Sequence, residues 1–385
     1  MRITGIKAHH FSVPMPPGRV GGVGRLFKRD WIAVEVSTDA GLVGWGESHH
    51  GQAPAAIANL VDHVLGPQLV GLPPHPAECW LRIQERYFRT HSPGAAAVMA
   101  YSGIDIALWD IAGQAAGVPV CVLFGYAPKR VRAYVGGHNL TYQPVDDLVA
   151  EARRWREAGF RGMKIRIGRG PAVDAEAVRA VREAVGPDVE VFADVNARYR
   201  LADALALLER IGSGTLGWLE EPLAVEERAA YRRLRSRTSQ VLAGGENAYS
   251  LRELEDTVAW ADIIQPDVTK IGGLTPFRDV VAVARLWGVR VVPHAMHSVI
   301  AQAATLHALA GLGADTWLEH DPGVDPLLWQ AEGPGLVIRD GWAEIPDRPG
   351  LGVRPRLAGL EGYPGTPGPS YGPTPLAGAD EDPGR

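Results

Sequence analysis

Six short apolar segments in the second half of the chain each end in a residue that can carry a charge. These end residues follow one another at intervals of 26, 26, 21, 27 and 25 positions. Carboxylates and histidines can bind metal ions or transfer protons when a fold brings them to one place. The regular interval therefore predicts a repeating structural unit that delivers each group to the same site. The residues are Asp194, Glu220, Glu246, Asp267, His294 and Glu319.

The first three of these residues are carboxylates from neighbouring segments. Clustered carboxylates repel one another unless a cation holds them together. Ligands that are all oxygen suit a hard ion such as Mg²⁺, with salt bridges to arginines as the alternative arrangement. We predict a Mg²⁺ site formed by Asp194, Glu220 and Glu246, and the even spacing favours Glu220 over its neighbour Glu221.

The next two residues, Asp267 and His294, form the candidate acid–base pair. A carboxylate beside an imidazole fixes the tautomer of the ring and raises its basicity, so the pair could remove a proton from carbon. The alternative for a lone histidine is a satisfied core residue. His297, in "PHAMHS", is the rival of His294. Glu319 lies beyond the pair and could donate a hydrogen bond to a substrate oxygen, unless it is an ordinary surface carboxylate.

One more segment, "GMKIRIG" at 162–168, contains two cations that are two residues apart. The period of a β-strand places Lys164 and Arg166 on the same face. A lysine with a lowered pKa can take a proton from carbon, whereas an arginine stays protonated and is better suited to clamping oxygen atoms. Lys164 is therefore a candidate base, and Arg166 is a candidate substrate-binding group.

The elements that must position these groups alternate between short apolar runs and amphipathic helical segments. Alternating strands and helices indicate parallel βα units, and eight units indicate a closed barrel with its active site at the carboxyl ends of the strands. No clear helix follows the last run, so we predict a TIM-like (β/α)7β barrel of the α/β class. The eight runs are "VRAYVGG", "GMKIRI", "VEVFAD", "LGWLEEP", "QVLAGGE", "ADIIQPD", "VRVVPH" and "DTWLEH".

Four regions follow from this division of the chain. Residues 1–128 contain strand-like and helical runs that predict an N-terminal α+β capping domain, and residues 129–325 form the catalytic barrel. Residues 326–360 are expected to return to the capping domain. Residues 361–385 are rich in glycine and proline, and we predict a disordered tail there because such a composition buries little apolar surface.

The composition excludes several other classes of protein. The 385 residues are 46% hydrophobic and 22% charged, with a net charge of −5, as in an ordinary globular protein. No long basic run favours nucleic acid or a membrane surface, and no apolar run has the length needed to span a bilayer. The N-terminus lacks a signal-peptide pattern, and Cys79 and Cys121 are in no metal-type spacing. We therefore expect free thiols and a cytoplasmic location.

Several motifs in these regions resemble one known family. "GFRGMKIRIG", "FADVN", "WLEEPL", "GGEN", "QPDVTKIGG" and "WLEH" resemble strand ends of the enolase superfamily in its mandelate racemase subgroup, the mandelate racemase/muconate lactonizing enzyme family. "SGIDIALWDIAGQAAGVPVCVLFG" resembles the passage from its capping domain to its barrel, and "DRPGLGV" resembles its C-terminal return. The resemblance extends from residue 1 to about residue 355 and implies a barrel enzyme that often assembles into homo-oligomers.

The resemblance also implies roles for individual residues. The three carboxylates would bind Mg²⁺, which together with Lys164 would stabilise the enediolate formed when a proton leaves the carbon α to a carboxylate. Asp267 and His294 would be the catalytic dyad, and Glu319 its electrophilic partner. Asn196 in "ADVN" would contact substrate, and Lys270 would lie outside the innermost ring of groups.

One position departs from the racemases of the subgroup. They place a lysine base where this chain has Arg166, and a sister subgroup has lysine where this chain has Asp267. Racemisation needs a base on each face of the α-carbon, so a single base, His294, favours β-elimination. The resemblance therefore implies an acid-sugar dehydratase that acts on a small carboxylate substrate. A racemase or epimerase of a 2-hydroxy acid is the alternative, and a barrel that only binds a carboxylate is a weaker one.

The identity of the substrate depends on capping-domain loops at about residues 14–30 and 46–54. Several side chains there could contact hydroxyls or a second carboxylate, although each could equally belong to a solvated loop. In the barrel, His297 could also contact substrate. The loop candidates are His49, His50, Arg25, Lys28 and Arg29.

Overall fold

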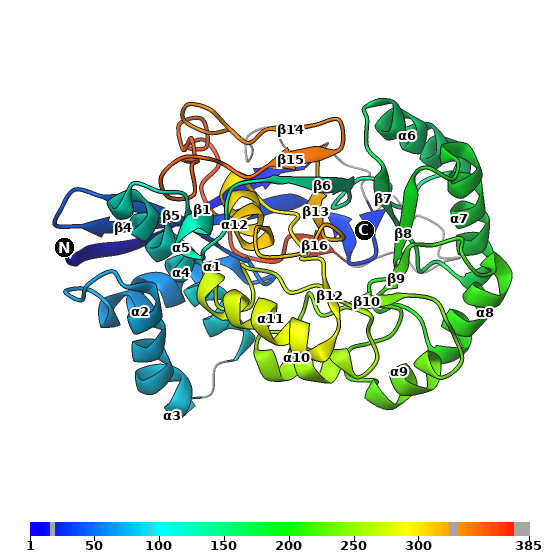
Figure 1. The fold of residues 1–385 in the computed structure, drawn as a ribbon, viewed down its shortest axis with the longest axis horizontal. Helices are drawn as coiled ribbons and strands as arrows, with labels where there is room; N and C mark the ends of the chain where they lie inside the picture. Colours follow the sequence, from blue (N-terminus) through cyan, green and yellow to red (C-terminus); the bar gives the residue numbers. More distant parts are fainter. Residues whose placement is uncertain (16–19, 92–93, 323–329, 373–385) are drawn as a thin grey trace.

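The structure is a computed structural model that describes residues 1–15, 20–91, 94–322 and 330–372. Figure 1 shows a capping domain, in blue and cyan, against one side of a barrel that runs from green to yellow. This arrangement agrees with the predicted α/β fold of a barrel with an N-terminal cap. Residues 16–19 of the first substrate loop and residues 326–329 of the predicted return lie outside the described residues.

The capping domain is built on an antiparallel sheet whose strand order is β1-β4-β5. Helix α4 packs so closely against β5 that a side chain at Gly46 would collide with the backbone carbonyl of Gly103. A second small sheet contains β2 and β3. The strands are β1 (Ile3–Pro14), β2 (Val20–Gly21), β3 (Gly24–Leu26), β4 (Lys28–Thr38) and β5 (Val43–Ser48). The helices are α1 (Pro54–Asn59), η1 (Leu60–Leu65), η2 (Gly66–Gln68), α2 (Pro76–Ile83), η3 (Gln84–Phe88), α3 (Arg89–His91), α4 (Ala95–Ala116) and α5 (Val120–Leu123).

Helix α4 corrects one expectation from the sequence. Its 22 residues are long and apolar enough to cross a membrane, so the statement that no run has that length is wrong for this helix. However, 83% of its most apolar window is buried inside the protein. The buried residues include Val98, Ile104 and Leu108, which pack in one cluster with Val34 and Val36 of β4. The apolar character of α4 is therefore explained by its place in the core of the capping domain.

Eight parallel strands form the barrel, and seven helices connect them in the described part of the chain. The hydrogen-bonded order runs from β12 back through β6, and β13 pairs with β6. The Thr316 hydroxyl donates to the Val291 carbonyl and joins β13 to β12. The strands are β6 (Arg130–Val135), β7 (Gly162–Arg166), β8 (Glu190–Asp194), β9 (Trp218–Glu220), β10 (Leu242–Gly244), β11 (Ile263–Ile264), β12 (Arg290–Val291) and β13 (Trp317–His320). The helices are α6 (Val145–Glu157), α7 (Pro171–Val185), α8 (Leu201–Ile211), α9 (Arg228–Arg235), α10 (Leu251–Val258), α11 (Leu274–Trp287) and α12 (Val299–Leu309).

An apolar layer lies beneath the functional groups of the barrel. Phe192 and Trp218 are stacked in one buried cluster, and each precedes a strand-end carboxylate by two positions. Because successive strand residues alternate between faces, a residue two positions later points to the same side. Val292 and Trp317 stand in the same relation to His294 and Glu319. The alternation that fills the interior with aromatic and aliphatic groups thus also directs the titratable groups to the mouth.

The C-terminal segment agrees with its prediction only in part, because it contacts both the barrel and the capping domain. Strand β15 (Trp342–Glu344) follows β14 (Ile338–Arg339) and pairs with β6 of the barrel, while Leu351 donates its N–H to Asp110 of α4 in the cap. Residues 361–372, predicted to be disordered, are ordered against the cap and end in β16 (Tyr371–Gly372), which pairs with β3. Backbone pairing and side-chain hydrogen bonds replace the apolar burial that this composition lacks. Residues 373–385 of the predicted tail lie outside the described residues.

Candidate active site

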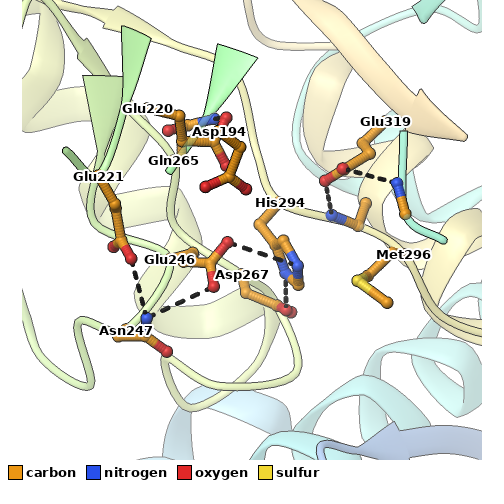
Figure 2. Close-up of polar contacts among 12 residues, drawn as sticks. Asp194, Glu220, Glu221, Glu246, Asn247, Gln265, Asp267, His294, Met296 and Glu319 are labelled. Atoms are coloured by element: carbon orange, nitrogen blue, oxygen red, sulfur yellow. Dashed lines mark hydrogen bonds and ion pairs between the residues drawn. The ribbon is translucent and has the colours of Figure 1, made fainter. Parts of the chain in front are cut away.

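Three carboxylates gather at the mouth of the barrel, as Figure 2 shows. Asp194, Glu220 and Glu246 each offer one oxygen, and these three oxygens lie within 4.8 Å of one another. Asp194 and Glu220 are completely buried, and Glu246 is largely buried. A group of buried carboxylates at this separation needs positive charge to offset its repulsion. The donor set is all oxygen, which fits a hard divalent cation such as Mg²⁺.

The two glutamates of "WLEEP" face different surroundings. Glu220 accepts hydrogen bonds from Gln265 Nε2 at 2.7 Å and from Trp218 Nε1 at 3.0 Å, which orient its carboxylate within the cluster. The backbone of Glu221 is left-handed, with φ at 34°, and its carboxylate accepts from Asn247 Nδ2 at 3.2 Å. Burial and the nearby carboxylates raise the pKa of Glu221 to about 8. Only Glu220 of the two is in the group that could hold a metal.

The charged groups of Lys164 and Arg166 both bind carboxylates. Lys164 Nζ donates to Glu220 Oε1 at 2.6 Å and lies 3.0 Å from Glu319 Oε1. Burial alone would disfavour its charge, but these two carboxylates outweigh it and raise the pKa of Lys164 above its usual value. Arg166 Nη1 donates to Asp194 and to Asn196 Oδ1, and Nη2 donates to a backbone carbonyl at 3.2 Å. Both side chains are therefore held as cations among acceptors.

The histidine that faces the carboxylate cluster is His294. Its Nδ1 lies 2.7 Å from Asp267 Oδ2, and its Nε2 lies 3.6 Å from Glu246 Oε2. His297 points its Nε2 at the same Asp267 oxygen, at 2.8 Å. The ionised Asp267 accepts from both rings, and these bonds hold its pKa well below the usual range despite burial. Since Asp267 takes Nδ1 of His294, the Nε2 atom of that ring is the one directed toward the cluster.

Glu319 lies across the mouth from Glu221, as Figure 2 shows, and it is surrounded by donors. Its Oε1 accepts from the backbone N–H of Gly137 at 3.2 Å, and its Oε2 accepts from the N–H of Ala295 at 3.3 Å. The carboxylate is completely buried, and the Lys164 charge lowers its pKa against the effect of burial. In this arrangement Glu319 is ionised and accepts hydrogen bonds. Its predicted role as a donor to substrate would require it to take up a proton.

A cavity of about 480 Å³ opens between the barrel mouth and the capping domain. This volume is in the usual range for small-molecule sites. Among the predicted loop residues, His49 and His50 line the cavity and stack on each other with ring centroids 4.6 Å apart. Asn196, His297 and Lys270 also line it.

The cations predicted in the first loop lie on β3 and β4. Lys28 Nζ donates to the Thr366 carbonyl at 2.7 Å and lies 3.1 Å from Asp30. Arg29 Nη1 lies 3.0 Å from Asp321 Oδ2. Both of these cations line the cavity, yet their charged ends are bound by other residues of the protein. Arg25 pairs through its backbone with strands β2 and β16.

Two groups that line the cavity, and a carboxylate that bonds to one of them, were not predicted from the sequence. His138 follows the first barrel strand, Asp321 follows "WLEH", and Tyr371 lies in the segment predicted to be disordered. His138 and Tyr371 line the cavity, and Asp321 bonds to His138 Nδ1 at 3.1 Å. A search that extended three residues past each strand end would have found His138 and Asp321. The sequence offers no such signal for Tyr371, because its position depends on a strand pairing with a distant loop.

Comparisons with known proteins agree with this geometry. The description "Enolase C-terminal domain-like" matches residues 147–358, and the mandelate racemase/muconate lactonizing enzyme N-terminal domain matches residues 8–125. The chain belongs to the mandelate racemase subgroup of the enolase superfamily. The carboxylates and the dyad lie within the matched barrel region, whereas Tyr371 lies beyond it.

Relatives with curated names span most of the chain. D-galactarolactone cycloisomerase of Agrobacterium fabrum is 31% identical over 92% of this chain and 96% of its own length. Arabinonate dehydratase of Saccharolobus solfataricus is 30% identical over 86% of this chain and 90% of its own. The chain is therefore an enzyme of this superfamily, and these two relatives are named for reactions of an acid-sugar lactone and of an acid sugar.

Solved structures show the same fold. An enolase superfamily member from Polaromonas sp. JS666 covers 97% of this chain and 100% of its own, with 36% identity and a TM-score of 0.91. A racemase from Streptomyces coelicolor A3(2) with bound magnesium covers 94% of this chain and 99% of its own, with 29% identity and a TM-score of 0.84. The bound ion in that relative agrees with the donor set found here.

Proposed function

We propose that this protein is a Mg²⁺-dependent dehydratase of a sugar acid or related polyhydroxy acid. The observation that carries the proposal is the orientation of His294, whose Nδ1 is fixed by Asp267 while its Nε2 faces the carboxylate cluster. A base beside a cation site can remove the proton α to a carboxylate that is held there. Curated relatives named arabinonate dehydratase and D-galactonate dehydratase support this reaction class.

The residues of this chain divide the reaction between them. His294 Nε2 takes the α-proton, and the ionised Asp267 stabilises the imidazolium that results. The same imidazolium then gives its proton to the departing β-hydroxyl, which leaves as water. The product is an enol that converts to a 2-keto-3-deoxy acid. One histidine thus serves both proton transfers, so the elimination needs no second base.

The metal site provides the electrostatic part of the chemistry. Mg²⁺ held by Asp194, Glu220 and Glu246 would stabilise negative charge that develops on the substrate carboxylate. Lys164 lies 2.6 Å from Glu220 and contributes positive charge on the same side. Asn196 and Arg166 line a small pocket together with Glu246 and His294, and from there they could contact a substrate oxygen.

The two cations of β7 argue against racemisation. Lys164 and Arg166, the candidates for a second base, both donate to carboxylates and hold their protons. A racemase needs a group on each face that can exchange a proton. We therefore expect the enzyme to act on a single configuration at the α-carbon. Assembly into homo-oligomers and a cytoplasmic location stay predictions.

The test is incubation with Mg²⁺ and a panel of acid sugars in deuterated water. The expected result is release of a 2-keto-3-deoxy acid, and exchange at the α-carbon of one epimer only. Equal exchange of both epimers would establish a two-base racemase and overturn the dehydratase. Loss of activity with a chelator and its return with Mg²⁺ would confirm the metal requirement.

A second candidate reaction is favoured by the curated relatives that span most of this chain. Two of them are named D-galactarolactone cycloisomerase and 3,6-anhydro-alpha-L-galactonate cycloisomerase. The same base could remove an α-proton while a ring oxygen at the β-carbon leaves and stays in the molecule. Mass spectrometry separates the two reactions, because dehydration loses one water and ring opening conserves the mass. A panel that includes lactones and anhydro acids therefore decides between them.

A further inference from the structure

The last described residues of the chain form part of the cavity wall. Residues 361–372 begin after the matched barrel region, cross the capping domain and reach the barrel mouth. Pro364 pairs with Phe11 of β1, and Tyr371 pairs with Leu26 of β3. This approach is close, because a side chain on Gly24 would collide with the carbonyl of Gly372. The sequence of β3 is thus adapted to the C-terminal strand.

Polar contacts fix this segment in place. Ser370 is buried, and its hydroxyl donates to Asp30 Oδ2 at 2.6 Å. The N–H of Ser370 donates to Gln52 Oε1 at 3.1 Å, and its carbonyl accepts from the N–H of Phe27 at 3.0 Å. A buried charge-assisted hydrogen bond of this kind is costly to break. Tyr371 is therefore presented to the cavity from a fixed backbone.

The neighbours of Tyr371 determine whether its hydroxyl donates or accepts a hydrogen bond. Tyr371 Oη lies 3.0 Å from His138 Nε2, and His138 Nδ1 lies 3.1 Å from Asp321 Oδ2. Asp321 also binds Arg29 at 3.0 Å and Asn139 Nδ2 at 2.7 Å, so it is ionised and can only accept. His138 must then carry its proton on Nδ1, and its Nε2 accepts from Tyr371. The oxygen of Tyr371 is left to act as an acceptor.

The location of Tyr371 decides what it can meet. It lines the same pocket as His294, Glu246 and Asn196, but it comes from the side of the capping loops. Under the proposed function, the carboxylate of a substrate is held at the metal cluster. The part of the substrate that reaches β3 and the C-terminal strand is then the end farthest from its carboxylate. An acceptor at that end can bind the donor of a hydroxyl group, whereas an ionised carboxylate has no donor to offer it.

We propose that Tyr371 is a specificity-determining residue whose oxygen accepts a hydrogen bond from the terminal hydroxyl of a polyhydroxy monocarboxylate. The inference rests on the proposed function for the direction in which the substrate lies. It selects acids with one carboxylate and a terminal alcohol over diacids of the same length. The geometry behind it is the chain of contacts from Tyr371 through His138 to Asp321.

The experiment compares Tyr371→Phe with Tyr363→Phe, a matched change in the same segment outside the cavity lining. Both are made in a His294→Asn background, which prevents turnover. Calorimetry with Mg²⁺ measures the binding of D-galactonate, its 6-deoxy analogue, D-arabinonate and galactarate. Tyr371→Phe should weaken D-galactonate about 3- to 10-fold, as expected for one neutral hydrogen bond. Tyr363→Phe should bind as the His294→Asn parent does.

The 6-deoxy analogue of D-galactonate provides a second test, which also gives a result for the protein that keeps Tyr371. The protein with Tyr371 should bind the 6-deoxy analogue more weakly than D-galactonate, and Tyr371→Phe should bind the two equally, because the effects are coupled. Equal binding of the two ligands with Tyr371 present, tighter binding of galactarate, or binding of none of these acids would overturn the proposal. Binding with the expected pattern but no α-proton exchange by wild type would refute the dehydratase and leave the Tyr371 assignment standing.

Discussion

The floor and the roof of the cavity are built in different ways. The floor is the ring of groups at the barrel mouth, which comes from strand ends at regular intervals and sits on a buried aromatic layer. The roof is formed by β3, the loop around His49 and the C-terminal strand, which are far apart in the sequence. Floor groups are fixed by strand geometry, whereas roof groups depend on tertiary pairing. Under the proposed function the floor carries the chemistry, and the proposal for Tyr371 places substrate selection in the roof.

The largest expected effect is on the metal site in the floor. Glu220→Gln should weaken Mg²⁺ binding by at least about 100-fold and abolish activity, because one ligand and one charge are lost. Glu221→Gln is the matched control and should retain both properties. Titration calorimetry with Mg²⁺ and an activity assay measure the two effects. If Glu221→Gln empties the site instead, the register assigned to β9 is wrong.

The next largest effect is expected for the predicted base, His294. His294→Asn should leave Mg²⁺ binding intact and reduce both dehydration and α-proton exchange by about 10²–10⁴-fold, the usual contribution of a general base. His297→Asn removes one partner of Asp267 and should cost less than about 10-fold. Deuterium incorporation at the α-carbon is the measurement. A mild His294→Asn together with a severe His297→Asn would move the catalytic role to His297.

Arg166 lies at the edge of the floor, and its substitution should have an intermediate effect. Arg166→Lys keeps a charge but loses the fork that donates to Asp194, Asn196 and a backbone carbonyl. We expect about a 10-fold loss of dehydration, mainly through weaker substrate binding. The variant also places an amine where racemases of the subgroup keep a base. Slow exchange of the opposite epimer should then emerge, and its absence would show that Arg166→Lys supplies no second base.

A smaller effect is expected in the roof. Ser370→Ala leaves the buried Asp30 Oδ2 without the hydroxyl donor that lies at 2.6 Å. The loss should cost about 1–3 kcal/mol in the stability of the C-terminal segment, while the floor keeps its affinity for Mg²⁺. Hydrogen exchange should accelerate at the amide of Phe27, which donates to the Ser370 carbonyl. Unchanged exchange there would mean that β16 is held mainly by its backbone pairing.

The smallest expected effect is a pH dependence at the contact between the roof and the barrel, where Tyr371 meets His138. Burial lowers the pKa of His138 below its unfolded value, although the bond to Asp321 acts in the opposite direction. Because the ring has the higher pKa in the unfolded chain, it takes up a proton there first as the pH falls. The free energy of unfolding that the neutral ring contributes therefore decreases below about pH 6.5. After correction for intrinsic rates, the Phe27 amide should exchange faster at pH 5 than at pH 7. The Ile167 amide, bonded to β8, should not follow, and parallel changes would refute a separate roof.

The sequence was sufficient for most of the floor. The intervals between strand ends, together with two-residue alternation, predicted that Asp194, Glu220 and Glu246 would meet, and the structure brings them within one cluster. The same reasoning placed Asp267 beside His294. These positions could be predicted because strand period and barrel closure are local and repetitive rules, whereas the roles of the residues stay predictions. The choice between His294 and His297 needed coordinates, since both rings reach the same Asp267 oxygen, and so did the ionised state of Glu319.

The contacts of the roof could not be predicted from the sequence in the same way. The glycine and proline content of residues 361–372 predicted disorder, because composition indicates how much apolar surface a segment can bury. Composition does not indicate whether a distant strand is available for backbone pairing. The pairing of Tyr371 with Leu26 joins positions at opposite ends of the chain. Its contact with His138 then depends on how the capping domain sits on the barrel. The sequence by itself determined the repeated units and the groups at their ends, whereas tertiary structure alone decided which distant segments close over them, because those contacts follow no local period.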